Sequence, residues 1–197
     1  MQATLKTKRI TYVAMFSAIA AVLMYLEFPL PFMPPFLKVD LSGIAVLLAA
    51  FMLGPMETVA VALLKDLVHL LSTQTGGVGE LADFLMLTSL ALTAHYIYRA
   101  NKTKRGALLS CVAGSGVMVV VAALSNYFLL IPFYSKLMPI DAIIAACAAV
   151  NPAIDSLGAY ILFGVLPFNI IKCFLISFVT MLSYKKLSQV LRLNMPL

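Results

Sequence analysis

Charged residues are scarce in this chain. Lys, Arg, Asp and Glu together make up 11% of its 197 residues, whereas hydrophobic residues make up 62%. A water-soluble domain is about one quarter charged and about half apolar. The composition therefore excludes a soluble enzyme and a nucleic-acid-binding protein, and it predicts an integral membrane protein whose solvent is a lipid bilayer.

The usual motifs of metal and nucleotide chemistry are also missing. The three cysteines form no CxxC pair, so neither a disulfide framework nor a thiolate metal site is predicted. His69 and His95 lie too far apart for an HExxH zinc motif, and no GxxxxGK[ST] phosphate loop is present. The halves of the chain do not match one another as the inverted repeats of many secondary carriers do. We therefore expect no metal and no ATP hydrolysis by the chain itself.

Long hydrophobic runs, by contrast, fill most of the sequence. A transmembrane helix needs about 20 apolar residues, and we expect six such helices, near residues 10–28, 41–53, 55–72, 78–98, 107–131 and 160–184. The second is short and is followed at once by Gly54-Pro55, which predicts a turn into a third helix or, alternatively, one broken helix. The predicted fold is all-α, a single integral membrane bundle over residues 1–197.

Basic residues gather in three clusters that predict how the bundle is oriented. Lys and Arg are retained on the cytoplasmic side of a membrane. All three clusters fall on one side only if six helices cross, which places both termini in the cytoplasm. The long external loop 132–159 is too apolar for disorder, and we expect a short helix in it. The clusters are Lys6, Lys8 and Arg9; Arg99, Lys102, Lys104 and Arg105; and Lys185, Lys186 and Arg192.

Ionisable residues inside membrane helices are costly, so each is a functional hypothesis. Asp66 and His69 share one helix face at i,i+3. They belong either to a structural network, with Asp66 paired to a lysine and to His69, or to a proton relay. Lys172 lies deep in the last helix and needs a carboxylate or a ligand. With Asn126 it could bind the imide edge of a planar heterocycle, although Asn126 could equally join two helices.

Two further segments have unusual sequences. The loop from Glu27 to Asp40 contains four prolines, which suppress helix formation, and three phenylalanines. It is either a rigid interfacial loop or a preformed lid over a pocket. On the first helix, Ala14 and Ala18 form an AxxxA motif, and small residues at this spacing allow another helix to approach closely.

Five motifs resemble the substrate-binding subunits, or S components, of energy-coupling-factor (ECF) vitamin transporters, and in particular their riboflavin-specific members. The motifs follow in order over nearly the whole chain. They are FPLPFMPPFLKVDLS, ALLKDLVHLL, GGVGELADF, SNYF and LPFNIIKCF.

The resemblance implies a subunit of the prokaryotic cell membrane that captures riboflavin from outside and is not itself an enzyme. The first helix, through Ala14 and Ala18, would couple to a transmembrane scaffold subunit driven by two cytoplasmic ATPases. Riboflavin would be the transported ligand, and no cofactor is implied. Asp83 departs from the family, where Asn is expected, and could pair with a lysine or alter contacts to the ribityl chain. The residues implied to bind the ligand are Leu37, Lys38, Asp40, Gly79, Glu80, Asp83, Asn126, Tyr127 and Lys172.

Three other interpretations are compatible with the sequence. The chain could be an S component for another vitamin or for metal uptake. It could be an ion-coupled secondary transporter that uses Asp66, His69 and Lys172 as a relay. An intramembrane enzyme is least favoured, because no nucleophile and base are paired in the sequence.

Overall fold

The computed structural model describes residues 2–34, 36–137 and 139–192, with side chains described for 6–34, 36–137 and 139–183. The chain is 79% helical, which confirms the all-α class. The helices are α1 Gln2–Tyr25, α2 Ser42–Met52, α3 Pro55–His69, α4 Val78–Ala100, α5 Lys104–Ser125, α6 Ile131–Tyr134, α7 Ile140–Ala148, α8 Leu157–Tyr160 and α9 Leu166–Arg192. Two-residue strands, β1 Phe28–Pro29 and β2 Lys38–Val39, pair antiparallel.

Two of the long helical rods contain a π turn. The Ile131 N–H donates to the Asn126 carbonyl, five residues back, so α5 continues through the π turn Asn126–Leu130 into α6. In the same way the Leu166 N–H donates to the Ile161 carbonyl, and α8 continues through Ile161–Val165 into α9. Such turns insert one extra residue into an α-helix and are frequent at functional sites.

Four helical rods are long and apolar enough to cross a membrane within the described part of the chain. They are Lys6–Tyr25, Val78–Ala100, Lys104–Tyr134 and Leu157–Ser183. At 1.5 Å per residue, the 11 residues of α2 extend about 17 Å and the 15 of α3 about 23 Å, less than the hydrocarbon core of about 30 Å. The second and third predicted spans are thus separate helices, both short.

Local sequence explains where these helices begin and end. Gly54 is extended and Pro55 takes the first helical position of α3, as the Gly-Pro pair predicts. The Thr103 hydroxyl caps α5 by accepting from the Gly106 N–H. The first helix ends at Tyr25 rather than at the predicted Phe28, because Pro29 disfavours helical backbone at Phe28, which pairs with Val39 instead.

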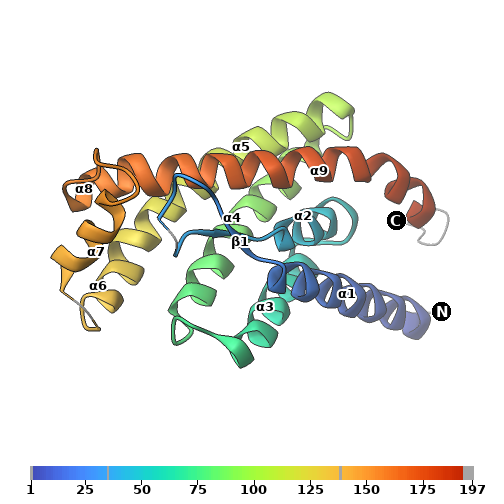
Figure 1. Cartoon of the computed structure of the whole chain (residues 1–197). Coiled ribbons are helices and arrows are strands. Elements are labelled where there is room, and N and C mark those ends of the chain that lie inside the picture. The colour runs from blue at the N-terminus through green and yellow to red at the C-terminus, as the bar shows by residue number, and fades with distance from the viewer. Residues whose placement is uncertain (1, 35, 138, 193–197) are drawn as a thin grey trace.

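The short helix α2 forms the centre of the core. All of its residues except Phe51 are buried, as expected for a helix that is apolar on every side. Gly43 lets the neighbouring helices approach, since a Cβ atom there would lie 2.5 Å from Ile176 Cδ1 on α9 and 2.8 Å from Leu87 Cδ2 on α4. Figure 1 shows α2 enclosed by α1, α4 and α9.

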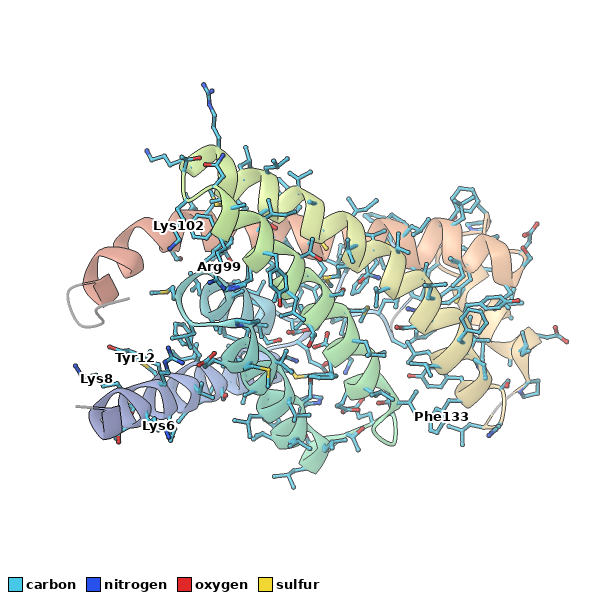
Figure 2. All side chains as sticks on the ribbon, turned by 180° about the vertical axis from the view of Figure 1, so that it is seen from behind. Lys6, Lys8, Tyr12, Arg99, Lys102 and Phe133 are labelled. Atoms are coloured by element: carbon cyan, nitrogen blue, oxygen red, sulfur yellow. The ribbon has the colours of Figure 1, made fainter. Side chains whose placement is uncertain are left out.

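The two ends of the bundle differ in what they carry. The start of α1, the end of α9 and the turn between α4 and α5 lie at one end in Figure 1, and α6, α7 and α8 lie at the other. The helix α7 is the short helix expected in the loop 132–159. Figure 2 shows Lys6, Lys8, Arg99 and Lys102 toward the first end and Phe133 toward the second. The third basic cluster falls outside the part of the chain whose side chains are described.

Candidate ligand-binding site

A cavity of about 480 Å³ lies where the loop 27–40 meets the end of α1, α3, α4, the π turn Asn126–Leu130 and α9. Its volume is within the range of about 300–1,000 Å³ usual for small-molecule sites. All of the predicted ligand-binding residues line it except Tyr127. That side chain is 51% exposed, and its ring packs edge-on against Phe128 with centroids 5.0 Å apart. The structure therefore brings together residues from sequence positions 37 to 172.

A buried charge network of Asp40, Lys65, Asp66, Asp83 and Lys172 reaches the cavity through Asp40, Asp83 and Lys172, which line it. Lys172 Nζ lies 2.7 Å from Asp40 Oδ2 and 2.8 Å from Asp83 Oδ1. Lys65 Nζ lies 2.6 Å from Asp83 Oδ2 and 2.6 Å from Asp66 Oδ1. Each of the five residues is at most 6% exposed. Three carboxylates thus surround two ammonium groups.

Asp83 joins the two lysines and so holds the network together. Each of its carboxylate oxygens accepts from a different lysine. The sequence left two roles open for Asp83, and the structure shows the first of them, pairing with a lysine. An asparagine here would leave Lys172 with Asp40 and Lys65 with Asp66, two balanced pairs.

Asp40 ties this network to the backbone of the core. Its Oδ1 accepts from the Ser42 N–H at 2.9 Å and from the Ser42 hydroxyl, so it satisfies the first backbone N–H of α2. Its Oδ2 accepts from Lys172 on α9. One carboxylate therefore fixes the end of the proline-rich loop to two helices.

The predicted pairing of Asp66 with His69 was wrong. His69 Nδ1 lies 2.9 Å from Glu80 Oε1 on α4, and the other Glu80 oxygen accepts from Thr73 and Thr75, each at 3.0 Å. Asp66 Oδ2 is buried without a hydrogen-bond partner among the described residues. His69 and Asp66 thus belong to different clusters, which removes the contact that a relay between them needs.

Two asparagines present amide groups to the cavity. Asn126 Nδ2 donates to the Ala122 carbonyl at 2.9 Å, and its Oδ1 accepts from the Tyr160 hydroxyl at 3.1 Å. Asn169 Nδ2 donates to the Val165 carbonyl at 2.9 Å, whereas its Oδ1 is buried with no partner in the described structure. Asn169 is not among the ligand-binding residues predicted from the sequence. Its position one turn before Lys172 was the available signal.

Aromatic rings also line the cavity. The Phe36 ring lies 6.4 Å from that of Tyr134 and 6.0 Å from that of Tyr160, in tilted arrangements. Tyr134 and Phe168 also line the cavity but are not among the predicted ligand-binding residues. Both lie in segments whose sequence indicates only an apolar span or a loop.

The proline-rich loop covers one side of the cavity. Strands β1 and β2 join its ends, and Lys38 pairs with Glu27 across them. At its tip Phe32 is 83% exposed and has φ of 68°, a left-handed conformation that costs a non-glycine residue free energy. The loop is therefore anchored at its base and conformationally strained at its tip.

The small residues of α1 lie outside the cavity and divide between two faces. Ala14 and Ala18 are exposed, whereas Ser17 and Ala21 are buried against the bundle. The AxxxA motif is thus on the outer surface of the molecule.

The model of the family described as ECF transporter, substrate-specific component, matches residues 8–184. The chain belongs to this family. It is accordingly a membrane transport subunit and not an enzyme, as the resemblance of its motifs indicated.

Named relatives agree with this assignment. The riboflavin transporter RibU of Staphylococcus aureus is 36% identical over 95% of this chain and 94% of its own length. The riboflavin transporter FmnP of Bacillus subtilis is 30% identical, with 93% of each chain covered. A solved structure of the S component of a bacterial ECF transporter superimposes with a TM-score of 0.75 at 34% identity, covering 94% of this chain and 98% of that one.

Proposed function

We propose that this S component captures riboflavin in the cavity between the proline-rich loop and α9, and passes it to partner subunits for uptake. The observation that carries the proposal is the composition of the cavity, which combines aromatic rings with amide and charged groups. Riboflavin has an apolar dimethylbenzene edge, an imide edge and a polyhydroxylated tail, and needs these surfaces together. Relatives named riboflavin transporters support the choice of ligand.

The residues suggest how the ligand would be oriented. Asn126, Asn169 and Lys172 would meet the imide edge, since they combine hydrogen-bond donors with an unpartnered carbonyl oxygen. Phe36 would pack on the ring system, and Glu80 would accept hydrogen bonds from the ribityl hydroxyls. No group in this arrangement is placed to make or break a covalent bond.

We expect the purified protein to bind riboflavin and to show the absorbance bands of oxidised flavin in the blue and near ultraviolet. Replacing Asn126 by Leu should weaken binding by about 1–3 kcal/mol, because a buried ligand group loses its partner. The matched control is Tyr127→Leu, since Tyr127 is the next residue but lies outside the cavity. Calorimetric titration measures both, and wild-type affinity in Asn126→Leu would place the pocket elsewhere.

We further propose that the chain crosses a prokaryotic cell membrane six times with both termini in the cytoplasm. In this arrangement α2 and α3 each cross the membrane once, although both helices are short. The gathering of Lys6, Lys8, Arg99 and Lys102 at the end where α1 begins supports it, because basic residues are retained on the cytoplasmic side (Figure 2).

This topology predicts opposite labelling of two exposed lysine positions. A single cysteine at Lys136, in the loop after α6, should react with an impermeant maleimide added to intact cells. One at Lys104, at the start of α5, should react only after the membrane is opened. The native cysteines of the described structure are buried, which lowers the background. External reaction at Lys104 would eliminate the six-crossing arrangement.

The partners we propose are a transmembrane scaffold subunit and two cytoplasmic ATPases. The exposed AxxxA face of α1 would contact the scaffold, since alanines at this spacing permit close helix packing. Hydrolysis by the ATPases would then supply the energy for uptake.

A further inference from the structure

A second large concavity lies between α5 and α9, away from the ligand cavity. It measures about 880 Å³ and shares no lining residue with that cavity. Its walls are almost entirely apolar, with Leu108 and Val112 on α5 and Phe174 and Phe178 on α9. Lys104 and Arg105 stand at one end. We refer to this concavity as the α5–α9 groove.

The groove exists because the two helices cross and then separate. They touch near Met118 and Cys173, whose sulfur atoms are 3.4 Å apart. Figures 1 and 2 both show α5 diverging from α9 toward the end where α5 begins. Gly116 faces the open space of the groove, since a Cβ atom built there would have nothing within 4 Å.

The dimensions and surface of the groove suit an acyl chain. Its lining on α5 runs from Arg105 to Val119, a rise of about 21 Å, which exceeds one leaflet of about 15 Å. On the facing side the Phe174 and Phe178 rings stack with centroids 5.8 Å apart and present a flat apolar wall. Leu108 and Val112 are 57% and 62% exposed, so α5 contributes surface that no described residue covers.

The charged end of the groove points to the occupant's headgroup. Lys104 and Arg105 are exposed and have no ion-pair partner among the residues described. They also occupy the first turn of α5, where the helix dipole favours an anion. Basic pockets between membrane helices on the cytoplasmic side are characteristic binding sites for anionic lipid headgroups.

We propose that the α5–α9 groove binds an anionic diacyl phospholipid, with an acyl chain along the apolar walls and the headgroup phosphate on Lys104 and Arg105. The site requires α5 and α9 to lie in the membrane, as in the proposed six-crossing arrangement. It does not depend on the identity of the vitamin.

Native mass spectrometry of the full chain in detergent tests this proposal with three probes. Phosphatidylglycerol should bind, phosphatidylcholine with the same acyl chains should bind more weakly, and glycerol 3-phosphate should not bind. Removing both charges in Lys104→Gln/Arg105→Gln should weaken phosphatidylglycerol binding about thirtyfold, at about fivefold for each cation. Filling the groove with Gly116→Phe should reduce the binding of both phospholipids.

Matched controls remove charge or add bulk elsewhere. Arg99→Gln/Lys102→Gln removes two cations that lie outside the groove, and Val120→Phe adds a ring to an exposed position of α5 that does not line it. Both should retain phosphatidylglycerol as the wild type does. Equal binding of the two phospholipids, binding of glycerol 3-phosphate as tight as that of phosphatidylglycerol, or unchanged binding by Gly116→Phe would each overturn the proposal. Because no readout uses riboflavin, failure of the proposed vitamin binding would be a separate result.

Discussion

Lys172→Met is expected to lose riboflavin binding and to unfold at a much lower temperature than the wild type. The substitution leaves Asp40 without a counter-ion and Asp83 with Lys65 alone, in a site where both carboxylates are buried. Breaking a buried ion pair by removing one partner costs about 3–5 kcal/mol. Thermal unfolding in detergent and riboflavin titration measure the two effects.

The charge network itself provides the control that separates stability from binding. Asp40→Asn leaves two lysines and two aspartates in the network. Its amide oxygen can still accept from the Ser42 N–H at the start of α2, so the variant should remain stable. The double variant Lys172→Met/Asp40→Asn has the same excess of one carboxylate as the wild type and should regain most of the lost stability. If Lys172 contacts the vitamin, this double variant should still bind riboflavin much more weakly than Asp40→Asn does, whatever Asp40 itself contributes to binding. Recovery of binding in the double variant would assign Lys172 a structural role only.

Ala14→Trp and Ala18→Trp should each abolish riboflavin uptake while leaving binding by the isolated protein nearly unchanged. Both alanines are exposed on α1 and neither lines the cavity. A bulky ring would block the close helix approach that small residues permit. Uptake into cells that contain the partner subunits, and affinity of the purified protein, are the two measurements.

The matched control for this pair is Leu109→Trp, which adds the same ring to an exposed position of α5. It should affect neither uptake nor binding. Loss of riboflavin binding in the α1 variants would show that the alanines belong to the internal packing of the fold. Normal uptake in them would show that this face of α1 meets only lipid.

The all-α class and the separation of α2 from α3 were predicted because they depend on composition and local signals, whereas the six membrane crossings stay a prediction. Scarcity of charge indicated the bilayer, and Gly54-Pro55 indicated the break between α2 and α3. The boundary at Phe28 was missed because the pairing with Val39, eleven residues away, competes there with helix formation.

The candidate site was predicted through family resemblance more than through chemistry. The sequence showed that Lys172 needs a carboxylate but could not select Asp40 and Asp83. That choice depends on how the proline-rich loop, α4 and α9 are placed relative to one another. Likewise, helical spacing favoured Asp66 for His69, whereas Glu80 reaches the imidazole from the neighbouring helix α4. Tyr127 belongs to the same SNYF motif as Asn126, but consecutive helical residues point in different directions.

The π turns at Asn126–Leu130 and Ile161–Val165 have a consequence for how this chain is compared with other members of its family. Each turn holds one residue more than a regular helix over the same rise, so everything beyond it is rotated by about 100° relative to an uninterrupted rod. Asn126 is the first residue of one turn, and Tyr160 immediately precedes the other. The two residues share a hydrogen bond. A family member with a straight helix at either place should therefore align with a one-residue gap there. Without that gap, side chains that face different directions would be aligned with one another.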